Sequence, residues 1–587
     1  MRHSTAHVLA AAISELYHGT KFGVGPVIDD GFFYDVLPLK PITESDLATI
    51  EAKMREVMKR DDPFVRKEMP IDEAIKLFAS MGQDLKVELL NDLREKGTTK
   101  IRPEEIHDVG EKSDVASVYE TGAFVDLCRG PHVAKSGEIG AFKLTRLAGV
   151  YWRGDEKKPQ LQRIYGLAFQ TQPELDAYVA MLEEAKKRDH RKLGKELGLF
   201  VFSDLVGPGL PLWTPKGTIV RNVLDEFVWS LRRPYGYQKV TIPHITKKDL
   251  YEKSGHWAKF SNELFKITTR EGHEYAMKPM NCPHHTQIFA SELRSYREMP
   301  QRYCETTMVY RDEQSGELSG LSRVLSITQD DAHVFCRENQ IEVEMFAIWD
   351  VIDKFYRAFG FELSVRFSRY DPGHFEKYLG TPEVWQKAEA QISSLLAKRG
   401  VTSYIDGKGE AAMYGPKIDF MTKDSLGRVL QVATIQLDFN QPKNFDLTCM
   451  NESGVAEPIV MIHCAIMGSI ERFVSTLLEH TAGIFPMWLA PAQIRLATVG
   501  KDHVAFAKKL LAELVEAGVR AEIDDADEKV GKKIRNAAMM KIPWTIVIGA
   551  KEAEGGDFTV NVFGQEEDVL IPAAELVSYA LEAAKRP

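Results

Sequence analysis

The sequence predicts a multidomain protein of the α+β class. Its 587 residues suffice for three to five domains of roughly 100 to 200 residues, each with its own core. Strand-like apolar runs alternate with helical stretches and turn signals along the chain. Few of them form the strand-helix-strand repeat of a doubly wound parallel sheet. We therefore expect mainly antiparallel sheets flanked by helices.

The N-terminal region, residues 1–182, is predicted to form one α+β domain. It begins with a helical pattern in which His3 and His7 lie four residues apart, so both imidazoles would share one face of the helix. Strand-like pieces such as FFYDV and a loop-rich CRGPH segment follow. Residues 183–199 are charged and helical, with glycines near their end, and we interpret them as a linker helix.

Two further domains are predicted after this linker. Residues 200–490 contain apolar runs separated by turn signals, which favours an antiparallel sheet with flanking helices. Residues 491–587 show a regular alternation of strands and helices, which is typical of a small α/β domain. Its helices are expected at 502–517, 528–540 and 573–584.

Composition excludes several classes of protein. Hydrophobic residues make up 44% and charged residues 27%, and the formal charge of -10 provides no global basic field for DNA. The basic stretches at 183–197 and 531–541 could contact phosphates, although a solvated helix face is an equally good interpretation. The longest apolar runs are shorter than the ~18 residues of a membrane span. Six cysteines without framework spacing, and no leader pattern, indicate a cytoplasmic protein with reduced thiols.

A phosphate-binding hairpin is predicted around Arg311 and Glu313. A polar, glycine-bearing loop follows them, and Arg323 begins the next strand-like run. The arginine fork suits phosphate because it can donate two parallel hydrogen bonds. One Arg-x-Glu alone is common in surface ion pairs. Together with GSIERF at 468–473 and GYQKVTIPHI at 236–245, however, the set resembles the three motifs of class II aminoacyl-tRNA synthetases.

Three further segments narrow this resemblance to one family. MKPMNCPHH, TQDDAHVF and VMIHCAIMGSIERF are similar to segments of the threonyl-tRNA synthetases, and the similarity covers nearly the whole chain. It implies an N-terminal editing domain at 1–182, a class II catalytic domain with an antiparallel sheet at 200–490, and an anticodon-binding domain at 491–587. We expect the chain to lack the small ubiquitin-like domain that usually precedes the editing domain, because it starts where that domain would end.

The same three segments supply Cys282, His333 and His463, and the resemblance implies that these residues hold one zinc ion per chain. Taken singly, a buried Cys or His is more often a packed side chain, but three together within class II motifs favour the metal. One thiolate and two imidazoles leave positions open for the amino group and hydroxyl of threonine. Valine has no hydroxyl, and a site that demands one can reject such an analogue by roughly 10⁴-fold.

The resemblance also assigns the substrate contacts. Arg311 would meet the α-phosphate of ATP, Arg323 and Arg472 the outer phosphates and adenine side, and Asp331 the threonine hydroxyl proton, with Mg²⁺ bridging the phosphates. The substrate carboxylate attacks phosphorus, so the enzyme supplies alignment and charge stabilisation. The implied catalytic residues are Arg311, Arg472, Gln329, Asp331 and Lys417; the ATP contacts are Arg311, Glu313, Arg323, Gln431, Thr434, Ser469 and Arg472; the threonine contacts are Met280, Asp331, Tyr414 and Gln436.

The chain departs from the family pattern in three places. Ile327 stands where an aromatic residue usually stacks on adenine, so apolar contact is expected instead. His284 replaces the glycine of NCPGH, which implies that the backbone there needs no glycine-only conformation. In the anticodon-binding domain, TVNVFGQEED lacks the usual arginines, so fewer base contacts are expected. The candidate contacts there are Lys532 and Glu552 or Glu554.

The two N-terminal histidines gain partners in FVDLCRGPH, where a cysteine and a histidine are again four residues apart. The spacing suits a tetrahedral zinc site. The region also resembles the editing domain shared by threonyl- and alanyl-tRNA synthetases, whose alanyl members bind zinc there. We favour the metal-free hydrolytic version of the threonyl members. The predicted editing residues are His3, His7, Cys128, His132, Asp126 and Lys86.

The function implied is a cytoplasmic, homodimeric threonine-tRNA ligase. It would use L-threonine, ATP and tRNA(Thr), hydrolyse mischarged seryl-tRNA(Thr), and bind neither DNA nor a membrane. One alternative is an RNA-binding regulator derived from a synthetase, which would be expected to have lost Arg311, Arg472 or the zinc ligands. Another is a class II enzyme for proline or serine, which would not need Cys282, His333 and His463 together.

Overall fold

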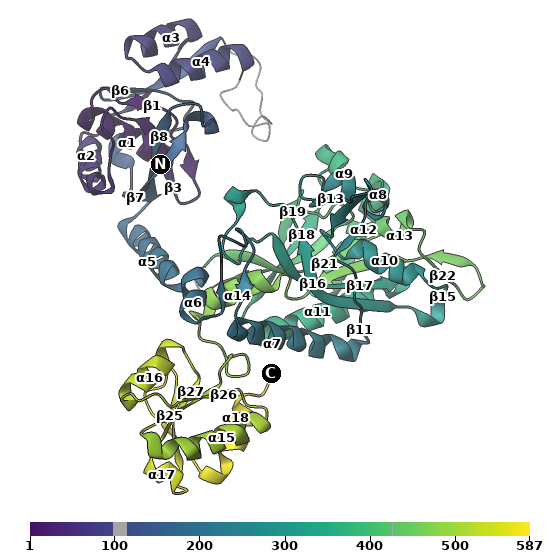
Figure 1. The fold of residues 1–587 in the computed structure, drawn as a ribbon. Helices are drawn as coiled ribbons and strands as arrows, with labels where there is room; N and C mark the ends of the chain where they lie inside the picture. Colours follow the sequence, from purple (N-terminus) through teal and green to yellow (C-terminus); the bar gives the residue numbers. More distant parts are fainter. Residues whose placement is uncertain (98–113, 425–426) are drawn as a thin grey trace. The chain divides into compact units, whose positions relative to one another are not determined.

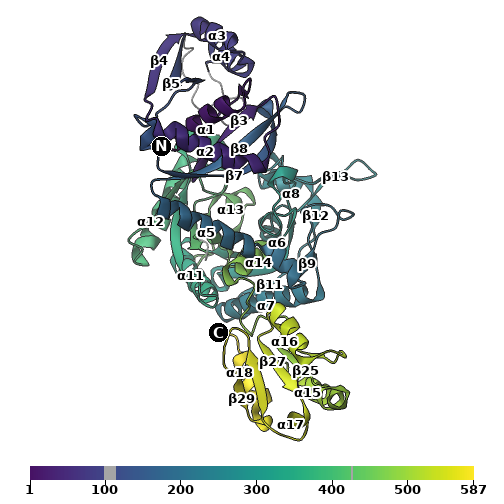
Figure 2. The same ribbon diagram turned by 90° about the vertical axis from the view of Figure 1, so that its left-hand side faces the viewer.

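The computed structural model describes residues 1–97, 114–424 and 427–587. Contacts divide the chain into two compact units, Met1–Glu183 and Glu184–Pro587 (Figures 1 and 2). Residues 184–587 fall in one unit, so the boundaries predicted at 199 and 490 stay predictions. No helix within the described ranges is long and apolar enough to cross a bilayer.

The first unit contains an antiparallel sheet covered by two helices. Helix α1 buries Ser4 to Ile13 against this sheet and against α2. The strand order is β1-β3-β8-β7, and β2 pairs with β3. These elements are α1 Arg2–Leu16, β1 Lys21–Phe22, β2 Val27–Ile28, β3 Gly31–Leu37, α2 Leu47–Lys59, β7 Ala141–Tyr151 and β8 Gln160–Phe169.

A smaller layer completes the first unit. Its three strands have the order β4-β5-β6, and a cluster around Phe78, Leu90 and Val118 packs two helices on them. Strand β6 ends directly before Cys128, which explains how the CRGPH loop reaches the histidines of α1. The elements are β4 Phe64–Pro70, α3 Ile71–Ser80, α4 Asp84–Lys96, β5 Val115–Thr121 and β6 Phe124–Leu127.

The helix predicted at 183–199 is in fact two helices. Helix α5 spans Gln172–Arg188, and α6 spans His190–Glu196. Asp189 separates them because its ψ of 121° is not helical and its carboxylate accepts the backbone N–H of Arg191 at 2.8 Å. An aspartate in this position is a strong N-cap, so it ends one helix and starts the next.

An eight-stranded sheet forms the centre of the second unit, and its antiparallel character is confirmed. The order is β11-β16-β17-β24-β21-β20-β18-β19, and only the two outermost pairs are parallel. Helix α11 packs on β21 and β24, and α14 packs on β17 (Figure 1). The strands are β11 Gln238–Lys239, β16 Gln301–Tyr310, β17 Ser326–Cys336, β18 Leu363–Arg369, β19 Ile405–Lys408, β20 Lys417–Lys423, β21 Val429–Asp438 and β24 Val460–Ala465.

Helices and short hairpins surround this sheet. The helices are α7 Pro215–Arg232, α8 Lys248–Lys253, α9 His256–Lys259, α10 Cys282–Ala290, α11 Ile341–Arg357, α12 Pro382–Lys398, α13 Asn440–Asn444 and α14 Ile470–Thr481. The short strands are β9 Phe200–Val201, β10 Leu212–Trp213, β12 Ile245–Lys247, β13 Lys266–Thr268, β14 Glu274–Met277, β15 Arg294–Ser295, β22 Thr448–Met450 and β23 Ala456–Pro458.

The C-terminal α/β pattern is confirmed, with two additions, the short helix α17 and the hairpin β28-β29. The three expected helices appear, and the sheet order is β26-β25-β27-β28-β29. The hairpin β28-β29 adds two antiparallel strands to the three parallel ones. The elements are β25 Ile494–Thr498, α15 Val504–Glu516, β26 Ala521–Asp524, α16 Val530–Met539, β27 Trp544–Ile548, α17 Ala550–Ala553, β28 Phe558–Val562, β29 Val569–Ile571 and α18 Leu576–Ala583.

A buried ion pair joins three parts of the second unit. Arg232, the last residue of α7, pairs with Asp330 of β17, and their exposed fractions are 3% and 0%. The other carboxylate oxygen of Asp330 accepts the backbone N–H groups of Ile466 and Met467, both at 3.0 Å. One carboxylate therefore fixes α7, β17 and the turn before α14 to one another.

We expect Asp330→Ala to destabilise the protein strongly, because it leaves the Arg232 guanidinium buried without its partner. Losing one member of a buried pair costs roughly 3–5 kcal/mol. Asp330→Asn should cost less, since its amide oxygen can still accept the two backbone N–H groups. Calorimetric melting of the full chain measures both. Equal melting temperatures for the alanine variant and the parent would contradict this role.

Candidate active site

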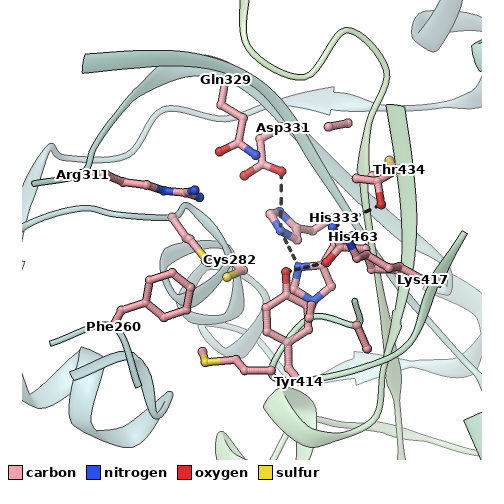
Figure 3. Close-up of a pocket in the computed structure, with 17 residues that line it drawn as sticks. Phe260, Cys282, Arg311, Gln329, Asp331, His333, Tyr414, Lys417, Thr434 and His463 are labelled. Atoms are coloured by element: carbon pink, nitrogen blue, oxygen red, sulfur yellow. Dashed lines mark hydrogen bonds and ion pairs between the residues drawn. The ribbon is translucent and has the colours of Figure 1, made fainter. Parts of the chain in front are cut away.

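A cavity of about 200 Å³ opens on one face of the eight-stranded sheet (Figure 3). It collects side chains from β17, β20, β21 and β24, from α10, and from the loop that precedes β20. The residues predicted from the sequence for catalysis, threonine and metal line it with the exception of Arg472, and so does Thr434, a predicted ATP contact. The lining residues among these predictions are Met280, Cys282, Arg311, Gln329, Asp331, His333, Tyr414, Lys417, Thr434, Gln436 and His463. The other predicted ATP residues, Glu313, Arg323, Gln431, Ser469 and Arg472, do not line this cavity.

Strand register brings the two histidines of this cavity together. His333 on β17 lies directly opposite His463 on β24, and His463 lies opposite Gln436 on β21. Since side chains alternate along a strand, Asp331 points to the same face as His333. Cys282 comes from outside the sheet, as the first residue of α10.

Cys282, His333 and His463 form a group that could hold a metal ion. Their ligand atoms lie within 4.8 Å of one another, and His333 Nε2 is 3.1 Å from His463 Nδ1. Burial lowers the pKa of His333, which keeps the imidazole in the neutral form that binds metals. Burial raises the pKa of the Cys282 thiol, and a cation beside it would favour the thiolate.

A second layer of residues orients the two imidazoles. The far nitrogen of His463, Nε2, lies 2.9 Å from Asp438 Oδ2, and Nδ1 of His333 lies 2.8 Å from Nδ1 of His285. Such partners commonly fix the ring orientation of metal-binding histidines. The donor set and its supports therefore suit a zinc ion. Sequence analysis missed both supports, although His285 stands within the NCPHH segment itself.

Asp331 is a buried carboxylate beside this group. It is 6% exposed, and its Oδ2 accepts a hydrogen bond from Asn281 at 2.9 Å. Burial raises the pKa of Asp331 to about 6, and the Asn281 contact opposes that rise. On the other side of the cavity Tyr414 donates to Gln436 at 2.7 Å and stacks on His463 with ring centroids 4.3 Å apart.

Asp419 organises the polar side chains next to the cavity. This carboxylate is fully buried. It pairs with Lys417 at 3.0 Å and accepts hydrogen bonds from Ser368 at 2.7 Å and from Gln431 at 2.8 Å. Arg366 donates to the same carboxylate at 2.9 Å and to the Gln431 side chain at 2.6 Å. Arg366 and Asp419 were not predicted, because only strand pairing brings them to Lys417 and Gln431.

The predicted phosphate-binding arginines lie in two neighbouring segments. Arg323 pairs with Glu313 at 2.6 Å on the loop between β16 and β17. Arg472, in the first turn of α14, has its backbone N–H bound by the Ser469 hydroxyl at 3.2 Å. Burial lowers the pKa of Arg472, and the charge of Arg323 lowers it further. The two guanidinium charges therefore repel one another, and an anionic ligand would relieve that repulsion.

Two of the departures from the family pattern can be located. His284 lies in the first turn of α10 with a helical backbone, as expected. Its side chain is buried, and neither ring nitrogen has a hydrogen-bond partner among the described residues. Ile327 lies on β17 opposite Val309, two residues before Gln329. His284 thus occupies a buried position whose ordinary helical backbone does not require glycine.

The predicted editing residues also come together, in the first unit. Cys128 Sγ lies 3.3 Å from His3 Nε2 and 3.3 Å from His132 Nε2, and the His7 ring packs against His132. Burial lowers the pKa of His7 to about 4 and that of His132 to about 3. Burial raises the pKa of the Cys128 thiol to about 11. These four side chains could also hold a metal ion.

A buried charge pair lies beside this tetrad. Asp126 pairs with Lys86, and both side chains are 3% exposed. Tyr34 donates to Asp126 at 2.5 Å, and His7 Nε2 lies 3.5 Å from the same carboxylate. Tyr34 was missed by sequence analysis, although it stands in the FFYDV segment. The Lys86 charge compensates a carboxylate that would otherwise be costly to bury.

The candidate anticodon contacts have local partners. Lys532 pairs with Glu528 one turn earlier on the chain. Glu552 is buried and accepts the backbone N–H of Gly549 at 2.9 Å, so its carboxylate caps the short helix α17. Of the three candidates, Glu552 therefore has a clear structural role.

Comparison with family models divides the chain into three matched regions. Residues 265–481 match the "tRNA synthetase class II core domain (G, H, P, S and T)", and residues 493–583 match the "Anticodon binding domain". Residues 116–165 match the "Threonyl and Alanyl tRNA synthetase second additional domain".

Curated relatives are similar over nearly the full chain. The threonine-tRNA ligase of Phocaeicola vulgatus is 45% identical over 96% of this chain and 85% of its own length. That of Gloeobacter violaceus is 45% identical over 99% of this chain and 92% of its own length. Among solved structures, an RNA binding domain of threonyl-tRNA synthetase from Cryptosporidium parvum covers 68% of this chain and 99% of its own, at 35% identity and a TM-score of 0.65.

Proposed function

The chain belongs to the threonine-tRNA ligase family, and from this premise we propose which of its residues perform each part of the reaction. The enzyme joins threonine to tRNA with ATP as the energy source. The observation that carries the proposal is the group formed by Cys282, His333 and His463, which faces a polar cavity beside Asp331.

We propose that these three side chains hold one zinc ion per chain. When bound, zinc supplies coordination positions for the amino group and the hydroxyl of threonine, and valine has no hydroxyl to fill the second of them. Asp331 would accept a hydrogen bond from the threonine hydroxyl and then receive its proton. Tyr414 and Gln436, joined by their own hydrogen bond, form the wall against the threonine side. Asp438 and His285 keep the ligand rings in place.

Adenylate formation needs alignment and charge compensation. The threonine carboxylate oxygen forms a bond to the α-phosphorus of ATP, the bond from that phosphorus to the β-phosphate oxygen breaks, and pyrophosphate leaves. Arg311 would stabilise the charge at the α-phosphate, while Arg323 and Arg472 hold the outer phosphates with Mg²⁺. Gln329 and Lys417 would orient the carboxylate, and their support is that both line the same cavity as Arg311. Glu313, Gln431, Thr434 and Ser469 complete the proposed nucleotide contacts.

A second, hydrolytic site is proposed in the first unit. Serine differs from threonine by one methyl group, which is worth only about 1–3 kcal/mol in binding. The residues that would position a water against the seryl ester are His3, His7, Cys128, His132 and Asp126. The water oxygen forms a bond to the ester carbonyl carbon, the bond from that carbon to the tRNA oxygen breaks, the tRNA oxygen takes up a proton, and serine is released. We propose that this site works without a metal, its side chains held in place by the thiol-imidazole contacts of 3.3 Å and, beside them, by the Lys86 and Asp126 pair.

The assembly and the location of the protein are also proposed. We propose a homodimer because of the resemblance to class II synthetases. A cytoplasmic location is proposed because all six cysteines are free thiols, which suits a reducing compartment. The chain has Arg311, Arg472 and the metal-binding group. This argues against the alternative of an RNA-binding regulator, which would be expected to have lost some of them.

Zinc analysis provides the first test. The purified protein should contain about one zinc per chain, and Cys282→Ala should remove it, because the thiolate supplies much of the affinity. Cys449→Ala, which changes a buried cysteine outside this group, serves as the matched control and should retain the metal. Full threonine activation by a zinc-free sample would contradict the proposed role of zinc.

Replacement of Arg311 tests the phosphate contact. Arg311→Ala should abolish threonine-dependent pyrophosphate exchange and leave tRNA binding largely intact, because the lost charge acts at the α-phosphate. Parallel loss of both activities, with a much lower melting temperature, would instead mean that Arg311 is structural.

The editing proposal is tested by His3→Ala combined with His7→Ala. Threonylation should stay near normal, while seryl-tRNA(Thr) accumulates when serine and ATP are supplied. His18→Ala, on the segment after α1, is the matched control. If the double variant and the parent hydrolyse purified seryl-tRNA(Thr) at the same rate, these histidines have no editing role.

A further inference from the structure

A buried histidine connects the start of α6 with the loop that carries the phosphate-binding arginines. His190 is 4% exposed, and its two ring nitrogens contact α14 and the loop between β16 and β17. Helix α6, which it begins, lies beside α14 (Figure 1). Its Nδ1 is 2.6 Å from Glu479 Oε1 on α14. Its Nε2 accepts the backbone N–H of Leu321 at 3.0 Å.

These contacts fix the tautomer of His190. A backbone N–H can only donate, so Nε2 carries no proton, and the ring proton lies on Nδ1 and is donated to Glu479. Asp189, His190 and Glu479 are close enough to hold a metal ion. Both ring nitrogens of His190 already have protein partners, however, so the contacts are explained as a hydrogen-bonded bridge.

The loop backbone packs directly on this ring. Gly320 has a φ of +50°, and a Cβ built there would lie 2.3 Å from His190 Nε2. Only glycine allows so close an approach. Next to it, the Ser322 hydroxyl lies 3.1 Å from that of Ser475 on α14. The middle of the loop is therefore held at two successive points.

The same loop carries three proposed ATP residues. Arg311 and Glu313 stand at its start and Arg323 near its end, and a bond of 3.0 Å from the Arg311 N–H to the Leu325 carbonyl closes it. We propose that His190 is a positioning residue for ATP, which holds this loop through Leu321 so that its arginines meet the phosphates. This inference rests on the proposed function of those arginines.

Two variants separate the bonds of His190. The amide of asparagine takes the place of Nδ1, so His190→Asn can still donate to Glu479 but cannot accept from Leu321. The longer glutamine reaches the place of Nε2, so His190→Gln can accept from Leu321 but loses the Glu479 bond. In pyrophosphate exchange with the full chain, His190→Asn should raise the KM for ATP roughly tenfold, the value of one hydrogen bond. His190→Gln should keep the KM for ATP near that of the parent. The KM for threonine should stay unchanged in both variants.

Glycine variants test the same contact without changing the histidine. Gly320→Ala should raise the KM for ATP, because its Cβ displaces the loop from the ring. Gly316→Ala, in the same loop with open space around the new Cβ, should leave it unchanged.

Arg323→Ala distinguishes the positioning role of His190 from the phosphate-binding role of the loop. If it raises the KM for ATP while the asparagine and glutamine variants behave alike, the positioning role of His190 is overturned and the phosphate role of the loop stands. If Arg323→Ala leaves the KM for ATP unchanged, the phosphate role of the loop is overturned, and the positioning role of His190, which rests on it, is overturned too.

Discussion

The register between β17 and β24 is the constraint on which the catalytic unit depends. It puts His333 opposite His463, and the next pairing puts Gln436 opposite His463. A slip of one residue would turn every side chain of a strand to the other face. His333 and Asp331 would then point into the hydrophobic core, and the metal-binding group and the cavity would both be lost. The site is thus a property of strand pairing and not of any single loop.

Buried polar contacts fix this register and connect the strands to the segments that carry the proposed phosphate contacts. Asp330 pairs with Arg232 and accepts the N–H groups of Ile466 and Met467, so β17 cannot shift against the turn after β24. That turn leads into α14 and so places Arg472. At the far end of α14, Glu479 binds His190, which holds the loop of Arg323. The proposed threonine and phosphate contacts therefore share one connected framework.

Much of this organisation could be predicted from the sequence. The apolar runs and turn signals of residues 200–490 predict the antiparallel sheet, and the resemblance to the threonyl-tRNA synthetases identifies the three metal-binding candidates. The supporting residues could not be found in this way. Asp438, His285, Asp419 and Arg366 act through contacts with distant segments, and an isolated aspartate or arginine is ordinary in any sequence. The break at Asp189 was also missed, since one capping contact outweighed the helical pattern on both sides.

We propose that threonine is selected by ligation to a zinc ion held by Cys282, His333 and His463. X-ray absorption at the zinc edge tests it most directly, with the zinc-loaded protein measured alone, with threonine and with valine. We expect one sulfur and two imidazole nitrogens in every sample, at about 2.3 Å and 2.0–2.1 Å. Threonine should add a nitrogen and an oxygen ligand, and valine should not add the oxygen. A spectrum without sulfur, or one that threonine leaves unchanged, would contradict selection by ligation to zinc.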